Sequence, residues 1–511
     1  MIMRNRALSE CYTLFFIRSH SSFQNVRRSY SSAPPAQVKP YASIPGLSSL
    51  PILGPIHHFL PVIGQFGPGV NIFDLMSTLH EKYGPIVRLQ GVFSRADFVI
   101  LYEPELIDQV YRSQEANPLR PGFQTLEYYR EVIKKGSLDG VYGLTTAQGE
   151  KWRDFRTKVN PALLKLKLVK VYAPPLGEIA QDLVQRIRRY KDDTQYLAKN
   201  LDLEITKWSL ESIAYVALGS RLGCLGDEVT KDHPGFTLLQ CSKDIIEYVF
   251  QLEFLPSVWK YFATPAYKKI ISTYDKQWEI STKYIEEARK RINARGHDIP
   301  EEEKSIVERL LAIDEKVAIL MANEMLFAGI DTVAFTAISV IYNLATNPEK
   351  QQRLREEIRS PDPHKRYLRA CLKEALRMRH VIPANLRRTD RDHFVAGYHI
   401  PAGVDVIAPN EYLSGLEKYY PRPKEFLPER WLADKSDPIY YGNAPAIVTL
   451  PFGFGIRSCI GRRIAELEIE TLMKKLFDEF EVTWEGSPIK VVTKVSNMFL
   501  EPYNFRFRSV K

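Results

Sequence analysis

The sequence predicts one large, mainly α-helical domain with small β-sheets, and three observations lead to this fold class. The middle third of the chain, roughly 171–295, has the apolar periodicity of amphipathic helices. The segment 315–346 is the longest helical pattern and is apolar on all sides, which is typical of a helix that runs through a protein interior. No linker interrupts the middle of the 511 residues, so we expect a single domain where length alone would suggest about three.

A small β-sheet is expected near the amino terminus. The pattern of residues 73–83 predicts a helix, which a Gly-Pro pair ends. Two apolar runs, 86–89 and 98–101, are separated by a polar turn and predict two strands. Prolines and glycines recur through residues 117–143 and predict a loop-rich segment.

Composition and charge narrow the classes of partner. The chain is 45% hydrophobic and 26% charged, as ordinary globular proteins are, and its formal net charge is +9. Five arginines and one glutamate fall within the first 30 residues and leave about +5 for the remainder. This surplus suits an acidic protein partner or a membrane surface better than nucleic acid, for which the sequence has no motif. The cysteines have no framework spacing, which favours a reducing compartment: Cys11, Cys224, Cys241, Cys371 and Cys459.

Residues 1–30 have the composition of a mitochondrial transit peptide. They are rich in arginine and serine, and their apolar run 12–17 is far shorter than the roughly 20 residues that cross a bilayer. Arg28 precedes the sequence Ser-Tyr-Ser, a pattern typical of matrix processing, so we expect cleavage after Tyr30. A merely disordered basic tail is the alternative. Residues 31–54 contain five prolines and predict an extended linker ahead of the main domain, 55–511.

A glycine-rich loop, 451–463, carries the cysteine around which the chain is organised. Its glycines permit tight turns and close approach to a flat partner, and a helical pattern continues from it to about Phe480. Cys459 lies where that helix begins, so backbone N–H groups are expected to point at its sulfur and to favour the thiolate. A thiolate is a strongly donating axial ligand for haem iron. The alternative for a lone cysteine is a buried structural thiol beside a turn.

The pattern Phe452-x-x-Gly455-x-x-x-Cys459-x-Gly461 resembles the haem-binding loop of the cytochrome P450 superfamily, the haem-thiolate monooxygenases. The resemblance covers about residues 39–508, and its details look closest to arthropod mitochondrial members. It implies the cytochrome P450 fold, with haem b held between the long helix and the loop and Cys459 as the axial ligand. It also implies that O2 and a lipophilic small molecule are substrates, the latter a steroid, an ecdysteroid-like lipid or a xenobiotic.

The segment Ala328-Gly329-Ile330-Asp331-Thr332 resembles the family's oxygen-activation motif. An acid inside so apolar a helix is costly without a purpose. By resemblance, Gly329 makes room for dioxygen, while Asp331 and Thr332 support the water chain that delivers protons. Alternatively, the Thr332 hydroxyl bonds to a carbonyl of its own helix and only bends it.

Several arginines are expected around the haem and behind it. By resemblance, Trp152 and Arg156, four residues apart on one helix face, are donors to a haem propionate. Arg387, favoured over its neighbour Arg388, and Arg457 are further propionate ligands. A separate set has a structural role, because a buried Glu-x-x-Arg pair with a second arginine fixes the segment behind the haem: Glu374, Arg377 and Arg430.

Basic residues on the cysteine side predict an electron donor. Arg369, Lys373, Arg462 and Arg463 resemble the surface by which mitochondrial members bind an adrenodoxin-type [2Fe–2S] ferredoxin, itself served by an NADPH-dependent reductase. A merely solvated helix face is the alternative. This reading places the protein on the matrix side of the inner mitochondrial membrane.

An aromatic stripe, 248–262, has two open readings: core packing, or a peripheral membrane contact beside the substrate entrance. Two other functions also remain open. One is an electron-independent haem-thiolate isomerase or dehydratase, which would leave Asp331, Thr332 and the basic surface idle. The other is a non-catalytic haem protein that senses gas. Residues 117–143 and 241–262 carry no readable code for the substrate.

Overall fold

The computed structural model describes residues 37–510 except 61–63, 68–69, 92–94, 115–116, 166–169, 227–228 and 296–298. The predicted transit peptide and its cleavage site lie outside the described residues. The described part is mainly helical with four small sheets, as the sequence predicts.

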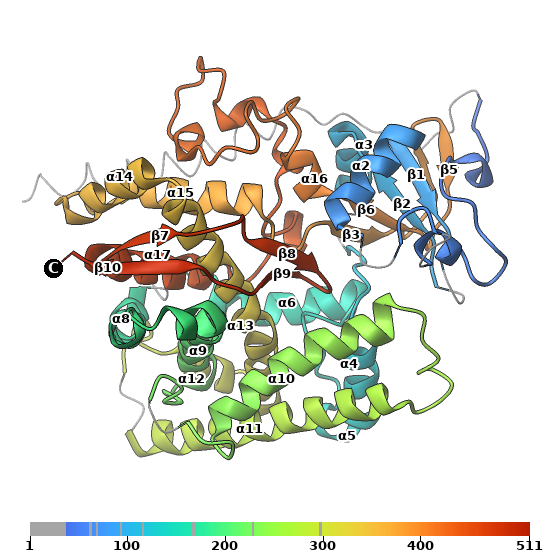
Figure 1. Ribbon diagram of the computed structural model, residues 1–511. Coiled ribbons are helices and arrows are strands. Elements are labelled where there is room, and N and C mark those ends of the chain that lie inside the picture. Colours follow the sequence, from blue (N-terminus) through green and yellow to red (C-terminus); the bar gives the residue numbers. More distant parts are fainter. Residues whose placement is uncertain are drawn as a thin grey trace, which may run out of the picture.

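The helical part is built around α13 (Glu315–Ala345), which Figure 1 shows between α10 and α11 on one side and α15 and α17 on the other. The Asp314 side chain accepts from the Lys316 amide and caps its amino terminus. The other helices of this part are α6 (Gly149–Leu163), α8 (Ala173–Tyr190), α9 (Thr194–Leu218), α10 (Pro234–Val249), α11 (Pro265–Arg295), α12 (Ile306–Leu311), α14 (Pro348–Arg359), α15 (Arg366–Met378) and α17 (Arg462–Glu479).

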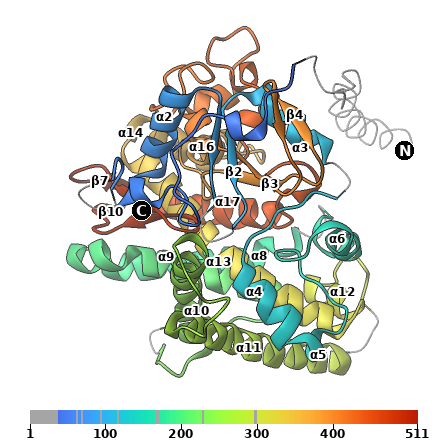
Figure 2. The same cartoon turned by 90° about the vertical axis from the view of Figure 1, so that its right-hand side faces the viewer.

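The main sheet has the strand order β1-β2-β6-β3 and lies on the opposite side of the molecule from α10 and α11 (Figure 2). Its strands are β1 (Ile86–Leu89), β2 (Phe98–Leu101), β3 (Asn385–Arg388) and β6 (Asp405–Ala408). β1–β2 and β3–β6 pair antiparallel, whereas β2–β6 is parallel. Two-stranded sheets are formed by β4 (His393–Val395) with β5 (Tyr398–Ile400), β7 (Phe480–Trp484) with β10 (Phe505–Ser509), and β8 (Lys490–Thr493) with β9 (Asn497–Leu500).

Helices α2 (Ile72–Tyr83), α3 (Pro104–Ser113) and α16 (Asn410–Ser414) cover the main sheet. The predicted helix at 73–83 and both predicted strands are confirmed. Part of the predicted linker behaves differently, because Ile44 and Leu47 are buried in the core of this sheet. A Cβ atom on Gly46 would lie 1.8 Å from the carbonyl oxygen of Arg88, so only glycine permits this close approach. The packed domain therefore begins before residue 55.

The segment 117–143 is less loop-like than predicted. It contains α4 (Gln124–Tyr128), a π-helical turn η3 (Tyr129–Ile133) and α5 (Lys135–Leu138). The prolines and most of the glycines stand before and after these short helices, whereas Gly136 lies within α5. Counting such residues overestimates the loop because a helix of about one turn needs little periodic sequence.

Among the described residues, α13 alone is long and apolar enough to cross a membrane. However, 67% of its most apolar window is buried inside the protein. Neighbouring parts of the protein therefore cover most of its apolar surface, as predicted for a helix that runs through the interior.

Candidate functional site

A cavity of about 2,140 Å³ lies between α13 and the glycine-rich loop that carries Cys459. Its walls include α4, α10, the turn between β8 and β9, and the segment that leads into β3. Pockets for drug-sized ligands are typically about 300–1,000 Å³. The cavity therefore has room for a large flat group and a substrate together.

Cys459 lines this cavity, and its accessible surface faces the cavity rather than bulk solvent. The preceding loop turns back on itself, since the Cys459 amide donates to the Phe452 carbonyl (2.8 Å) and Gly455 adopts φ 62°. The backbone N–H groups of Gly461 and Arg462 point at the sulfur, as expected for a cysteine ahead of α17. The other described cysteines, Cys224, Cys241 and Cys371, are buried away from the cavity.

The expected preference for the thiolate is not a property of the chain alone. Burial raises the pKa of Cys459, and it outweighs the two N–H groups and the guanidinium groups of Arg156 and Arg120, which lower it. Sequence reasoning counted the helix terminus but not the desolvation. A bound metal ion deprotonates a coordinating thiol outright, so this result is compatible with a metal ligand.

Arg457 lies two residues before Cys459 and is held by α6 and by the segment that precedes this helix. Its guanidinium lies 4.0 Å from the centre of the Trp152 ring on α6. It donates to the carbonyls of Leu144 (3.3 Å) and Ala147 (2.8 Å). The structure thus brings together two of the predicted propionate ligands, Trp152 and Arg457.

Three further guanidinium groups, those of Arg120, Arg156 and Arg387, lie close to Arg457. Burial, together with their positive charges, lowers the pKa of Arg457 to about 8. Burial and Arg120 also lower the pKa of Arg156, whose Nε is buried without a partner among the described residues. The nearby carboxylate of Glu324 already pairs with Arg130 (2.6 Å). Such a concentration of buried positive charge requires anionic groups from a ligand.

Arg387 and Arg388 differ in their surroundings, although Arg388 and not Arg387 is among the residues that line the cavity. Arg387 is buried, donates to the Phe454 carbonyl (3.0 Å) and lies over the ring of Tyr111. Arg388 instead forms two hydrogen bonds of 2.8 Å with the Asp405 carboxylate on β6. Its charge is therefore already neutralised, whereas that of Arg387 is not.

Two contacts of the oxygen-side segment add to what its motif predicts. A Cβ atom on Gly329 would lie 2.6 Å from Ile213 of α9, so close packing of the two helices also favours glycine here. The Thr332 hydroxyl donates to the Ala328 carbonyl (2.7 Å), which is the alternative left open above. Both residues nevertheless line the cavity.

Asp331 also lines the cavity, and its carboxylate accepts a hydrogen bond from Ser242 of α10. Burial raises the pKa of Asp331, whereas the Ser242 hydrogen bond and the charge of Lys243 lower it. An acid with a raised pKa in a cavity is a candidate for proton transfer.

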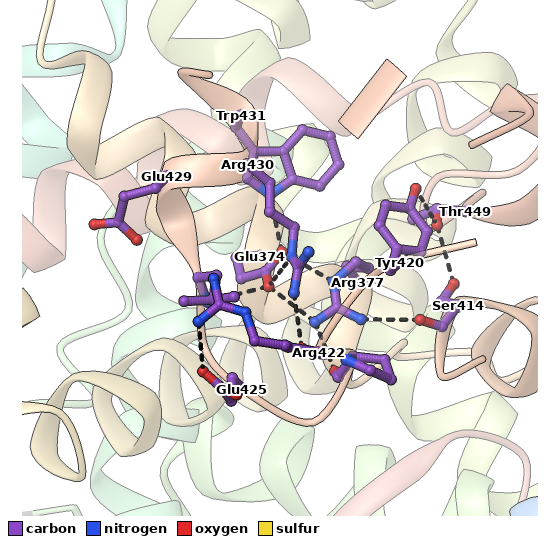
Figure 3. Close-up of polar contacts among 12 residues, drawn as sticks. Glu374, Arg377, Ser414, Tyr420, Arg422, Glu425, Glu429, Arg430, Trp431 and Thr449 are labelled. Atoms are coloured by element: carbon purple, nitrogen blue, oxygen red, sulfur yellow. Dashed lines mark hydrogen bonds and ion pairs between the residues drawn. The ribbon is translucent and has the colours of Figure 1, made fainter. Parts of the chain in front are cut away.

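The predicted set behind the site is assembled and completely buried (Figure 3). Glu374 pairs with Arg377 (2.8 Å) and with Arg430 (2.9 Å), and it also accepts from the Trp431 indole N–H (3.0 Å). The guanidinium of Arg377 additionally donates to the Ser414 carbonyl (2.9 Å). One carboxylate therefore joins α15 to the irregular segment that precedes the cysteine loop.

The four basic residues of the predicted partner surface are partly paired within the chain. Arg369 pairs with Glu470 (3.0 Å), and Arg462 pairs with Glu466 (2.9 Å). The Arg463 guanidinium donates to the carbonyl of Leu164. Lys373 lies at the surface with its Nζ 5.6 Å from the centre of the Trp431 ring, and this partial burial, together with the charges of Arg462 and Arg369, lowers its pKa. Among the described residues, Lys373 and Arg463 are therefore the members of this set without an ion pair.

Part of the aromatic stripe, 248–262, packs in the core, and part of it is exposed at the surface. Val249, Leu252 and Trp259 are buried, whereas Tyr261 and Phe262 are 78% and 69% exposed. The exposed part lies in the segment between α10 and α11, which also lines the cavity. Further exposed apolar side chains precede α2: Leu50, Ile52, Leu53 and Leu60.

Four residues of the site were missed by sequence reasoning: Arg120, Gln148, Ser242 and Glu468. Gln148 accepts from the Arg457 guanidinium (3.0 Å) and from the Arg120 amide (2.8 Å). Glu468 lines the cavity with both carboxylate oxygens buried and unpartnered among the described residues, and burial raises its pKa well above the usual value. The Ala-Glu-Leu-Glu pattern gave Glu468 one possible signal, an acid on the apolar face of α17. Arg120 and Gln148 stand in segments without periodicity, and Ser242 lies on a predicted helix where a serine gives no signal of a site.

The family model for cytochrome P450 matches residues 45–507. The chain is 36% identical over 501 residues to "Probable cytochrome P450 12a5, mitochondrial" of Drosophila melanogaster, covering 93% of this chain and 92% of that protein. It is 36% identical over 505 residues to "Cytochrome P450 CYP12A2" of Musca domestica, with the same coverage of 93% and 92%. It is also 35% identical over 486 residues to "Cytochrome P450 12b1, mitochondrial" of Drosophila acanthoptera, covering 91% and 89%.

The residues fit the cofactor of that family, haem b with a cysteine thiolate ligand. The thiol of Cys459 faces a cavity large enough for haem, and glycines let the backbone of the loop approach this cavity closely. A cluster of buried guanidinium groups beside the cavity can pair with the two propionate carboxylates of haem. The chain therefore belongs to the cytochrome P450 family of haem-thiolate monooxygenases.

Proposed function

We propose that this protein hydroxylates a lipophilic small molecule in mitochondria, with O2 and with electrons from an adrenodoxin-type [2Fe–2S] ferredoxin. The observation that carries the proposal is the arrangement of Cys459 and the Asp331–Ser242 pair in one mainly apolar cavity. The bound haem supplies the oxygen chemistry, and the protein binds, orients and tunes it. Cys459 would be its axial ligand, within the loop that Phe452, Gly455 and Gly461 shape.

The arginines have a binding role in this proposal. Arg120, Arg156, Arg387 and Arg457, with the Trp152 indole, would hold the two propionates. Guanidinium groups suit this task because their planar fork matches a carboxylate. The propionates in turn would remove the mutual repulsion that lowers the pKa of Arg457.

The α13 residues would handle protons. The Asp331 carboxylate would accept protons from the α10 side, where Ser242 orients it, and release them toward the cavity. The Thr332 hydroxyl would use its remaining acceptor capacity to hold a water there. The apolar walls would exclude bulk water, which favours a lipophilic substrate such as a steroid-like lipid or a xenobiotic.

Two further sets of residues would support the haem site: one fixes the cysteine loop, and the other binds the electron donor. Glu374, Arg377 and Arg430 would fix the loop structurally. The positive surface of Arg369, Lys373, Arg462 and Arg463 would attract an acidic ferredoxin, served by an NADPH-dependent reductase. Residues 1–30 would act as the transit peptide, in line with the mitochondrial names of the relatives. The exposed apolar side chains beside the cavity support a peripheral contact with the matrix face of the inner membrane.

Two measurements on the purified protein test this function. Dithionite reduction under carbon monoxide should give the absorption band of a thiolate-bound haem, and Cys459→Ser should abolish that band. Turnover of a lipophilic probe should then require ferredoxin, its reductase and NADPH. An isomerase or dehydratase would turn over without electrons, and a sensor would not turn over at all.

A further inference from the structure

Two segments form the wall of the cavity on the β8–β9 side, and neither belongs to the haem cradle. One is the segment 381–385, which runs from just after α15 to the first residue of β3. The other is 492–496, the end of β8 and the turn that leads into β9. Strand pairing holds only Asn385 and residues 492–493, so the remaining positions depend on contacts with residues behind them.

The residue behind the turn is Asn497, the first residue of β9, which is 2% exposed. All the polar atoms of its side chain are used. Its Nδ2 donates to the His380 carbonyl (2.8 Å) and to the Glu411 carboxylate (2.6 Å), while its Oδ1 accepts from the Thr493 hydroxyl (2.6 Å). Its backbone N–H donates to the Val381 carbonyl (2.8 Å). One residue, through its side chain and its backbone N–H, thus joins the two wall segments.

Glu411, on α16, contacts both Asn497 and the wall segment 381–385. Its amide donates to the Pro383 carbonyl (3.0 Å), and its carboxylate accepts from Asn497. The preceding residue, Asn410, accepts from the Asn385 side chain (2.8 Å) and so ties the end of the same wall segment. The nearest opposite charge is Arg379, whose guanidinium donates instead to Asn343 (3.0 Å).

Neither Glu411 nor Asn497 lines the cavity itself. Any effect on a ligand must therefore pass through the two segments that they hold. The turn also closes the cavity toward α10, since Val495 packs against the core cluster of α10 and Lys494 pairs with Glu247 (2.5 Å). Movement of the turn would change both the shape of the wall and its contact with α10.

We propose that Glu411 and Asn497 are positioning residues that fix this wall and so determine which lipophilic molecules fit above the haem. The proposal rests on the haem site described above. Because the substrate is not identified, two imidazoles of different size serve as probes. Imidazole itself can reach the haem iron without filling the cavity, whereas a triaryl-substituted imidazole such as clotrimazole fills it and contacts the walls.

The experiment measures the spectral Kd of both probes for the wild type, Glu411→Ala and Asn497→Ala. Loss of the buried hydrogen bonds should raise the Kd of the triaryl imidazole by about tenfold. The Kd of imidazole and the carbon monoxide spectrum should stay within about twofold of the wild type, since the haem site is unchanged. Glu411→Gln, which retains an acceptor for Asn497, should restore tight binding of the larger probe. Glu417→Ala, an exposed change beyond α16, is the matched control and should bind both probes normally.

A milder variant, Thr493→Val, tests the proposal even if the alanine variants fail to fold. It replaces the hydroxyl that bonds to Asn497 with a methyl group of similar size in the wall itself and should raise the Kd of the larger probe with a smaller change. Equal weakening of both probes, or unchanged binding of the larger probe in all three variants, would overturn the proposal. Absence of a thiolate-type spectrum in the wild type would instead contradict the proposed haem site.

Discussion

Ser242 of α10 donates a hydrogen bond to Asp331 of α13, and both residues line the cavity. This hydrogen bond lowers the pKa of Asp331 against the larger, opposite effect of burial. It therefore keeps a larger fraction of the carboxylate charged near neutral pH than burial alone would allow.

Substitution of this pair should change the pH dependence of turnover. In Ser242→Ala the pKa of Asp331 should rise further, so the acid limb of the turnover rate should move to higher pH. Asp331→Asn, which cannot exchange a proton, should lose turnover by about 100-fold while still binding substrate. Steady-state rates over a pH series, with spectral Kd values in parallel, measure both effects.

Ser209→Ala is the matched control for Ser242→Ala. The Ser209 hydroxyl also bonds to α13, but to the Ile330 carbonyl (2.7 Å) and not to the carboxylate. It should leave the acid limb in place. An identical shift in both variants would mean that the packing of α13, not the charge of Asp331, sets the pH profile.

The regular elements of this chain are readable from sequence because their signals are local. The span of α13 and the strands at 86–89 and 98–101 follow from apolar periodicity and turn residues. The Glu374 network is also predictable, because its three members stand in recognisable motifs.

What escaped prediction depends on contacts between distant segments. Ser242 and Asp331 are 89 residues apart, and Arg120 approaches Arg457 from a segment without periodicity. The packing of Gly329 against Ile213 had no signal in the motif, because Ile213 lies on another helix. Desolvation of Cys459 is likewise a property of the folded surroundings and has no signal in the loop sequence.

Removal of one arginine of the propionate cluster should loosen the haem. In Arg120→Gln and Arg387→Gln a charge-assisted hydrogen bond worth about 1.5–3 kcal/mol is lost, which corresponds to roughly 10-fold to 100-fold faster haem release. Transfer of haem to apomyoglobin, followed by absorbance, measures the rate.

Arg388→Gln separates haem binding from stability. Arg388 pairs with Asp405 inside the sheet, so this variant should lower Tm and leave the rate of haem transfer near the wild-type value. Faster haem release from Arg388→Gln than from Arg387→Gln would contradict the proposal and indicate that Arg388 binds the propionate.

The Glu374 network should tolerate no loss of its carboxylate. Glu374→Ala leaves two fully buried guanidinium groups and the Trp431 N–H without their acceptor, which should cost about 3–5 kcal/mol of unfolding free energy. The expected result is little soluble haem-containing protein. Glu429→Gln is the control, because Glu429 is partly exposed and its ion pairs with Lys350 and Arg353 are worth about 0–1 kcal/mol. Comparable yields for the two variants would contradict the structural role.

Reduction by ferredoxin should depend on the charge at Lys373. Lys373→Glu should raise the KM for an adrenodoxin-type ferredoxin about tenfold at low salt, because a charge reversal weakens electrostatic attraction. The difference should shrink in about 0.5 M salt, where screening shortens the range of the charges. Lys290→Glu, an exposed reversal on α11, should have little effect. Equal KM changes in both variants would indicate a general charge effect and no defined surface.

The stability of the protein should depend on pH through Glu411. Burial raises the pKa of this carboxyl from 4.5 to about 7, so the folded state binds a proton that the unfolded state releases between these values. A carboxyl with a raised pKa destabilises the folded state as pH rises through that window, here by at most about 3 kcal/mol. Glu411→Gln removes the titrating group and keeps the acceptor for Asn497. The Tm of the variant should therefore be close to that of the wild type at about pH 4.5, should exceed it increasingly up to about pH 7, and should keep a constant advantage above that pH. A Tm difference that does not vary across this range would show that the Glu411 carboxyl does not titrate in the folded protein.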